Sequence, residues 1–136
     1  MNDRPELHAF ASRYAKAWCS QDPEKVAAFF AERGSISINN GPPAVGRAAI
    51  AKEAQAFMTT FPDMIVRMDK VVRDEEGTKF HWTLTGTKTG PNGTGKKVRI
   101  SGYELWKIDN DRLIAESKGH FDSAEYERQL TYGVDS

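Results

Sequence analysis

The spacing of apolar residues changes at Pro62, and this change constrains the fold more than any other feature of the sequence. Before Pro62, apolar residues recur every three or four positions, which is the period of a helix with one buried face. After Pro62 they alternate, which is the period of a strand with one buried face. Helices therefore precede a run of consecutive strands. This order predicts an α+β fold in which helices cover one face of a mostly antiparallel sheet.

Three helices are expected in the first half of the chain. The first covers residues 7–18, where apolar side chains form one stripe. The second covers residues 22–34, because Asp22 is a good N-cap, a proline follows it, and the glycine at the end is typical of a helix C-terminus. Residues 35–38 alternate as a short strand, and the third helix spans residues 47–60.

Four strands are expected in the second half. The alternating segments are residues 64–68, 80–86, 98–108 and a last one that begins at residue 113. Glycines and acidic residues between these segments are typical of turns and loops. A short helix from Asp122 to about Leu130 is expected after the last strand.

Composition limits the class of protein. The 136 residues are enough for a single domain, 1–136, with its own core. Nineteen basic residues balance nineteen acidic ones, which argues against nucleic acid as a partner. No apolar run reaches the ~20 residues of a membrane helix, and the first residues do not resemble a signal peptide. One cysteine fits a reducing cytoplasm, and three scattered histidines predict no zinc site.

Several segments of the chain resemble a known family. They are residues 61–63, 82–90, 93–98, 113–122 and 129–130. Together with the order of the elements, they are similar to the SnoaL-like branch of the nuclear transport factor 2-like superfamily, over nearly the whole chain. The resemblance implies a cone-shaped, curved sheet, three helices in the N-terminal half that enclose a pocket, a short C-terminal helix, and a homodimer through the sheet. The superfamily includes polyketide cyclases, ketosteroid isomerases, dehydratases, epoxide hydrolases and non-catalytic proteins, so the fold alone does not define the activity.

Glu104 is the first candidate for a catalytic residue. It alternates in phase with Trp106 on an otherwise apolar strand face. A carboxyl group in apolar surroundings has a raised pKa and can donate a proton to a substrate oxygen. The opposite face, with Tyr103 and Leu105, is also apolar, so the pattern leaves open which face is buried. By resemblance, the matching position carries a functional acid in ketosteroid isomerases and a polar pocket residue in SnoaL-like cyclases.

Tyr14 is the second candidate, because a hydroxyl on the apolar stripe of a helix needs a polar partner. That partner is a substrate oxygen, Glu104, the backbone or water. The resemblance implies the role of an oxyanion donor, as in ketosteroid isomerases. Their carboxylate base has no match, because its position falls at or near Ile38, and Asn39 and Asn40 beyond it carry amides, which do not abstract protons. Steroid-type isomerisation is therefore disfavoured, and Asn40 is assigned to substrate binding.

The segment His120-Phe121-Asp122 contains two further candidates. SnoaL-like cyclases carry an essential aspartate in the final strand region, around a Trp-Asp pair and a later Asp. Here Lys118 and Gly119 stand in place of the pair, and only Asp122 remains. His120 and Asp122 share a strand parity, so they are candidates for an acid–base pair. Alternatively, Asp122 is the N-cap of the terminal helix.

Two functional hypotheses follow. The first is a cofactor-free enzyme that performs acid–base chemistry (cyclisation, dehydration or isomerisation) on a small apolar carbonyl or polycyclic compound. In this hypothesis Glu104 and Tyr14 polarise a substrate oxygen, and Asp122 or His120 moves a proton. The second is a non-catalytic module that binds a small molecule or dimerises. In the first hypothesis the apolar walls of the pocket are Phe10, Trp18, Phe57, Trp82 and Trp106.

Overall fold

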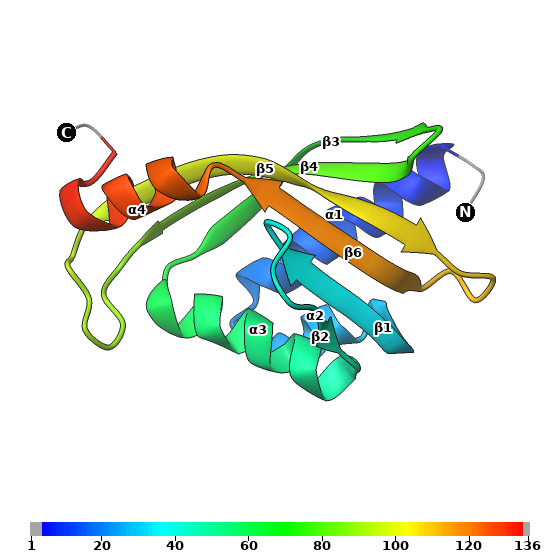
Figure 1. Ribbon diagram of the computed structural model, residues 1–136, viewed down its shortest axis with the longest axis horizontal. Helices are drawn as coiled ribbons and strands as arrows, with labels where there is room; N and C mark the ends of the chain where they lie inside the picture. Colours follow the sequence, from blue (N-terminus) through cyan, green and yellow to red (C-terminus); the bar gives the residue numbers. More distant parts are fainter. Residues whose placement is uncertain (1–3, 135–136) are drawn as a thin grey trace.

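The computed structural model describes residues 4–134 and builds them into one six-stranded sheet with four helices (Figure 1). The helices are α1 (Arg4–Cys19), α2 (Pro23–Ala27), α3 (Arg47–Thr60) and α4 (Ser123–Tyr132). The strands are β1 (Phe30–Ile38), β2 (Ala44–Val45), β3 (Ile65–Asp74), β4 (Gly77–Thr87), β5 (Lys97–Ile108) and β6 (Ile114–Phe121). The expected α+β fold, with three helices in the first half and a short helix after the last strand, is confirmed.

The sheet is curved and mostly antiparallel (Figure 1). Strands β3, β4, β5 and β6 pair antiparallel in chain order, as expected for consecutive strands joined by short connections. Strand β1 pairs parallel with β6 and carries the short β2 on its outer edge, so the strand order is β2-β1-β6-β5-β4-β3. Helix α1 packs against β3, while α3 packs against α2 and β1. The curved sheet and these helices together enclose the core.

The second helix is shorter than the sequence pattern predicts. Helix α2 ends at Ala27 and β1 begins at Phe30, so the expectation of a helix as far as Gly34 is wrong. Phe30 is fully buried and pairs with Ile114 of β6. A Cβ atom added to Gly34 would lie 2.8 Å from the carbonyl oxygen of Ile114. Packing against β6 therefore overrides the local helical pattern, and Gly34 permits two strands to approach closely.

Tyr14 lies at the centre of the aromatic core. Its ring makes edge contacts with Trp106 at 5.1 Å and with Phe80 at 5.2 Å between centroids. The rings of Trp106 and Phe80 stack on each other at 5.0 Å. Tyr14 is buried because it lies on the apolar stripe of α1, as the spacing predicted. The packing of α1 thus brings a tyrosine hydroxyl to the inner face of β5.

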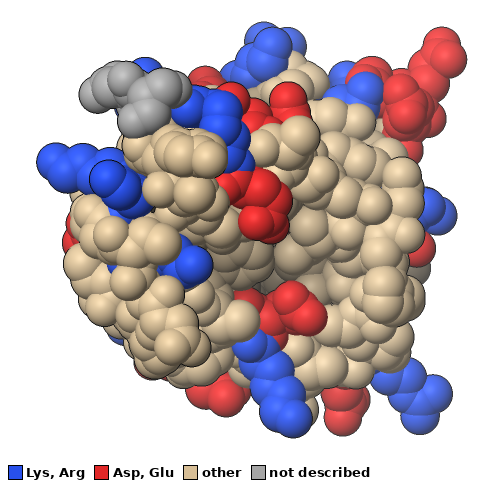
Figure 2. All heavy atoms as spheres, turned by 60° about the vertical axis from the view of Figure 1, so that its left-hand side comes forward, with Lys and Arg blue, Asp and Glu red and all other residues tan. Residues whose placement is uncertain are grey.

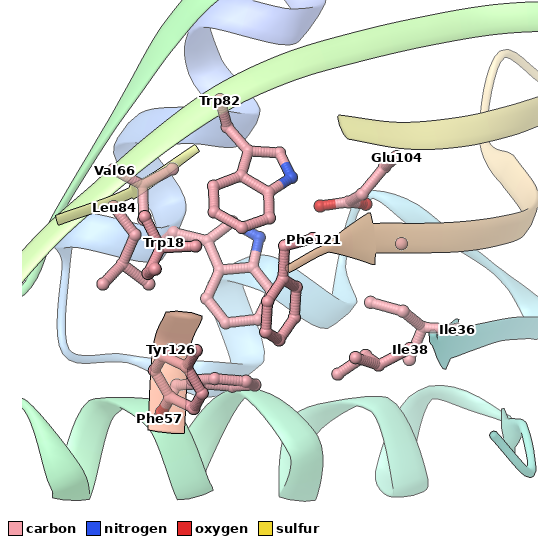
Figure 3. A pocket seen from close by; sticks show the side chains of 12 residues that line it. Trp18, Ile36, Ile38, Phe57, Val66, Trp82, Leu84, Glu104, Phe121 and Tyr126 are labelled. Atoms are coloured by element: carbon pink, nitrogen blue, oxygen red, sulfur yellow. The ribbon is translucent and has the colours of Figure 1, made fainter. Parts of the chain in front are cut away.

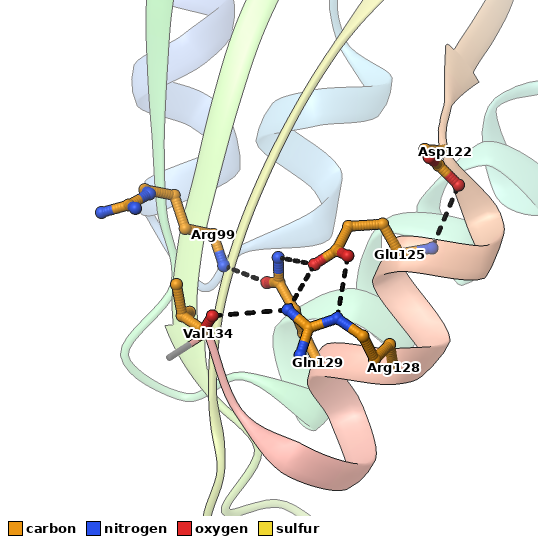
Figure 4. A network of polar contacts seen from close by, with 6 residues as sticks. All are labelled: Arg99, Asp122, Glu125, Arg128, Gln129 and Val134. Carbon is orange, nitrogen blue, oxygen red and sulfur yellow. Dashed lines mark hydrogen bonds and ion pairs between the residues drawn. The ribbon is translucent and has the colours of Figure 1, made fainter. Parts of the chain in front are cut away.

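Helix α4 follows β6 directly and is held by two side chains. Asp122 is its N-cap, because the carboxylate accepts a hydrogen bond from the backbone N–H of Glu125 at 3.0 Å. The pairing of β5 with β6 stops at Gly102. Beyond that point, Oε1 of Gln129 accepts a hydrogen bond from the backbone N–H of Arg99 at 2.7 Å (Figure 4). A side chain of helix α4 therefore binds the part of the β5 edge that does not pair with β6.

The surface around α4 carries charges of both signs. Figure 2 shows this side of the molecule hollowed, with uncharged side chains in the hollow and acidic side chains at its border. Within residues 4–134, no helix is both long and apolar enough to span a membrane.

Candidate functional site

A small cavity lies between the sheet and helices α1, α3 and α4, and its volume is about 70 Å³. Its walls are almost entirely apolar, and Glu104 is the only charged residue among the twelve that line it (Figure 3). The lining residues are Trp18, Ile36, Ile38, Phe57, Val66, Trp82, Leu84, Ile100, Glu104, Gly119, Phe121 and Tyr126. An apolar cavity with one converging polar group is typical of a small-molecule site.

Glu104 reaches this cavity from the middle of β5. It lies opposite Phe80 of β4 and Gly119 of β6, and only 7% of its surface is exposed. The structure thus decides which strand face is buried: Glu104 and Trp106 point inward. Tyr103 lies on the opposite face of the sheet. The neighbouring Gly119 has no side chain to cover the carboxylate, so the glutamate remains at the wall of the cavity.

The two carboxylate oxygens of Glu104 have different surroundings. Oε1 accepts hydrogen bonds from the Tyr14 hydroxyl at 2.8 Å, from Nε1 of Trp106 at 3.0 Å and from the Ser117 hydroxyl at 2.7 Å. Oε2 accepts no hydrogen bond from any residue within 4–134. Every fully buried polar side-chain atom in that range has a partner, so Oε2 is not fully buried. Oε2 is therefore the oxygen that the cavity can reach (Figure 3).

Burial raises the pKa of Glu104 above the ordinary value of 4.5. The hydrogen bonds from Trp106, Ser117 and Tyr14 oppose this shift, because they stabilise the ionised form, but burial outweighs them. Burial also raises the pKa of Tyr14 well above its usual value, and the neighbouring Glu104 charge adds to the shift. Tyr14 therefore keeps its proton and donates a hydrogen bond to Oε1. The site consists of a hydrogen-bonded glutamate that holds its proton more tightly than an exposed one.

The candidate wall residues fall into two groups. Trp18, Phe57 and Trp82 line the cavity. Phe10 packs outside it, with its ring 5.7 Å from that of Trp106. Trp106 itself stands behind the carboxylate, where its indole N–H binds Oε1.

Two other positions singled out in the sequence lie at and beyond the end of β1. Ile38, at or near which the resemblance puts the base of the isomerases, lines the cavity with an apolar side chain. Asn40 follows β1 in an exposed turn, with a φ of 63°, and is not among the lining residues. The structure therefore places the apolar side chain of Ile38 at the cavity and leaves Asn40 exposed to solvent.

Asp122 and His120 do not converge on Glu104. Asp122 is exposed and caps α4, which is the alternative interpretation of this residue. The ring of His120 lies 5.0 Å from that of Tyr103, and these two residues are cross-strand neighbours. Because Tyr103 and Glu104 point to opposite faces of β5, His120 is separated from the cavity by the sheet. The expected acid–base pair is not assembled at this site.

Several residues of the site were missed from the sequence, and Ser117, Phe121 and Tyr126 are the most informative of them. Ser117 is fully buried and binds Oε1 of Glu104. Phe121 and Tyr126 close the cavity on the side of α4, and their rings contact each other at 5.5 Å. Ser117 and Phe121 share the inner face of β6, a parity that the sequence carries but that the undetermined register of the last strand concealed. Within residues 4–134, no group of three His, Cys, Asp or Glu side chains is placed to hold a metal ion.

The architecture is that of the ketosteroid isomerase-like fold, which many solved structures share. TsrD from Streptomyces laurentii is 17% identical, with a TM-score of 0.81 and coverage of 96% of this chain and 98% of that one. A protein from Catenulispora acidiphila DSM 44928 with this fold, in complex with trimethylamine, is 16% identical, with a TM-score of 0.78 and 94% of each chain covered. The phenazine biosynthesis-related protein PhzB2 from Pseudomonas aeruginosa is 17% identical, with a TM-score of 0.73 and coverage of 98% and 93%. At these identities the likeness defines the fold alone.

The family model of the SnoaL-like polyketide cyclases matches residues 8–130, and the chain belongs to this family. The resemblance noted in the sequence is thereby confirmed. A search of curated proteins found no match.

Proposed function

We propose that this protein is a cofactor-independent acid–base enzyme that acts on a small, apolar carbonyl compound. The observation that carries the proposal is the buried carboxyl group of Glu104, which presents one oxygen to an otherwise apolar cavity. Membership of the SnoaL-like family supports the proposal, because this family takes its description from polyketide cyclases. A cavity of about 70 Å³ favours a small compound over a polycyclic one, since sites for drug-sized ligands measure about 300–1,000 Å³.

A single carboxyl group is sufficient for a balanced proton transfer. In its ionised form, Oε2 of Glu104 takes a proton from the carbon next to the carbonyl group, and the substrate becomes an enolate. The protonated carboxyl then returns that proton to another carbon, which is an isomerisation, or to an alkoxide formed by ring closure, which is an aldol-type cyclisation. In both cases the carboxyl ends in the form in which it began.

The surroundings of Glu104 suit this cycle. The apolar walls exclude water, so the ionised carboxylate is poorly solvated and more basic than an exposed one. Tyr14 donates to Oε1 and therefore acts on the substrate through Glu104, since its hydroxyl is occupied by that bond. Asp122 and His120 have no part in the proposed cycle because neither reaches the cavity.

The proposal is tested by proton exchange on simple ketones. The protein is incubated with cyclopentanone or cyclohexanone in D₂O, and loss of the α-proton signals is followed by NMR. We expect the wild type to accelerate the exchange and Glu104→Gln to lower the rate by about 10²–10⁴-fold, the usual contribution of a positioned acid or base. The amide introduced by this substitution would keep an oxygen for the three donors, so the variant should fold. The matched control is Glu127→Gln, which changes an exposed glutamate of α4 and should exchange like the wild type.

The alternative function is a non-catalytic binding module. It is favoured by the apolar Ile38 at the wall and by the presence of a single carboxyl group among the residues that line the cavity. Wild-type protein that binds the ketones, detected by chemical-shift perturbation, but leaves the exchange rate unchanged would overturn the enzymatic proposal. Equal exchange rates in the wild type and Glu104→Gln would do the same.

A further inference from the structure

We propose that Ser117 is a positioning residue for Glu104. Its hydroxyl donates a hydrogen bond to Oε1 and so helps to keep Oε2 as the oxygen that carries the proton. This inference rests on the proposed role of Glu104. It concerns a residue that is not among those lining the described cavity, so it would not touch a ligand bound there. Ser117 acts only through the carboxylate that it binds at 2.7 Å.

The three donors on Oε1 come from three different elements. Tyr14 belongs to α1, Trp106 to β5 and Ser117 to β6. Each is buried, with at most 1% of its surface exposed. Because the donors approach one oxygen from separate parts of the fold, rotation of the carboxyl group would break all three hydrogen bonds at once. The orientation of the two oxygens is therefore fixed by the fold.

This orientation determines where a proton can reside. A carboxylic acid holds its proton on one oxygen. The indole N–H of Trp106 is a donor only, so Oε1 always faces at least one hydrogen and is a poor place for a second. The hydroxyl of Ser117 adds a further donor to the same atom. The acid proton is accordingly held on Oε2, which faces the cavity.

Few other groups can influence the titration of Glu104. Tyr14 on α1 is the one titratable side chain bonded to it. The facing residues of the neighbouring strands, Phe80 on β4 and Gly119 on β6, are uncharged. Besides Glu104, Tyr126 on α4 is the titratable residue among those that line the cavity, and burial raises its pKa above the ordinary value of 10.0. A change in the pKa of Glu104 after removal of the Ser117 hydroxyl should therefore report the loss of this hydrogen bond directly.

The experiment is a pH titration of Glu104, followed by NMR in protein labelled with ¹³C at the glutamate carboxyl carbon and assigned with Glu104→Gln. We expect Ser117→Ala to raise the pKa of Glu104, because the ionised form loses a donor. Ser117→Thr keeps a hydroxyl and should restore the wild-type titration. The matched control is Ser101→Ala, which removes a hydroxyl bonded to Thr83 in the antiparallel neighbour β4. It should leave the titration of Glu104 unchanged.

A folded Ser117→Ala protein with the wild-type titration would overturn the inference. If the alanine variant does not fold, the pair Ser117→Thr and Ser117→Val, similar in shape but differing in the hydroxyl, gives the same comparison. In the ketone exchange assay, Ser117→Ala should lower kcat about tenfold, with little change in KM, since one hydrogen bond to a charged group is lost. The titration needs no substrate, so it fails or succeeds independently of whether any ketone is exchanged.

Discussion

Glu104 and Glu125 each accept several hydrogen bonds, yet their pKa values are shifted in opposite directions. Glu125 receives hydrogen bonds from the side chains of Arg128 and Gln129 on α4 (Figure 4). These bonds lower its pKa from 4.5 to about 2. Burial raises the pKa of Glu104, although three donors bind one of its oxygens.

The difference shows how neutral hydrogen-bond donors and a cationic donor affect the pKa of a carboxyl group. All three donors to Glu104 are neutral, and they do not offset the loss of water around the carboxylate. Glu125 lies near the surface and faces the guanidinium of Arg128 at 2.7 Å, so its charge is stabilised at little cost in solvation. Glu125 is therefore held as an anion that organises α4, whereas Glu104 holds its proton more tightly than an exposed glutamate does.

The largest expected effect is loss of the acceptor at Glu104. Glu104→Leu leaves three buried donors without their common partner, and each unsatisfied group costs about 1–3 kcal/mol. We expect the free energy of unfolding to fall by about 3 kcal/mol or more. Urea unfolding followed by tryptophan fluorescence measures this change.

Glu104→Gln is the control for this experiment, because the amide retains an oxygen for the three donors. Its free energy of unfolding should stay much closer to that of the wild type. Equal stabilities of the Leu and Gln variants would show that the donors find other partners, and the proposed rigidity of the carboxyl group would be wrong.

A second, smaller effect is expected in the network around Glu125. Gln129 is 5% exposed and supplies the acceptor for the backbone N–H of Arg99. Gln129→Ala should lower the free energy of unfolding by about 1–3 kcal/mol, because it removes two hydrogen bonds, one from the backbone N–H of Arg99 and one to the carboxylate of Glu125. Gln55→Ala, which removes an exposed hydrogen bond to Thr59 within α3, should change it far less. Similar losses in the two variants would show that water replaces Gln129 at the edge of β5.

Much of the fold could be predicted because its apolar periods are simple. The alternation after Pro62 predicted four consecutive strands, and antiparallel pairing in chain order followed from their short connections. The end of the second helix was predicted wrongly. Phe29 and Phe30 continue the helical spacing, but the chain leaves the helix after Ala27 to pair with β6. Such pairing joins distant segments, and local spacing carries no information about it.

The site could be predicted only in part, for a similar reason. Glu104 was one of several partners considered for the Tyr14 hydroxyl, and their hydrogen bond at 2.8 Å joins residues 90 positions apart. Ser117 lies in a segment, Ile114–Phe121, whose small and charged residues give no clear alternation. Its inward position depends on the register of β6 against β5, which places Ser117 opposite Trp106. That register is determined by the pairing of whole strands, so it cannot be predicted from the sequence around Ser117 alone.

A third prediction separates capping from catalysis at Asp122. Asp122→Ala removes the acceptor for the N–H of Glu125, and loss of an N-cap costs about 0.5–2 kcal/mol. We expect a lower melting temperature and an unchanged rate of ketone exchange, because Asp122 lies outside the cavity. Asp122→Asn should lose less stability, since asparagine is also a good N-cap. A normal melting temperature combined with slower exchange would instead assign Asp122 a part in the chemistry.

The smallest effects, and the most direct test of the contrast between the two glutamates, lie in the pH dependence of stability. The folded-state pKa of Glu104 lies above 4.5, so its protonation favours the folded state below pH 4.5, and this contribution is lost as pH rises through the raised pKa. The folded-state pKa of Glu125 is about 2, so its contribution is present above pH 4.5 and is lost as pH falls towards 2.

Urea midpoints measured over a pH series for the wild type, Glu104→Gln and Glu125→Gln should therefore diverge in opposite directions. Relative to the wild type, Glu104→Gln should gain stability as pH rises above 4.5, because it carries no group that must ionise in the core. The advantage of the wild type over Glu125→Gln should instead shrink as pH falls below 4.5, because the unfolded state then binds a proton at Glu125 that the folded state does not bind until the pH approaches 2. A difference between the wild type and Glu104→Gln that stays constant above pH 4.5 would mean that the Glu104 pKa is not raised. Glu104 would then be no more basic than an exposed glutamate, and the site would lack the raised basicity on which the proposed proton transfer depends.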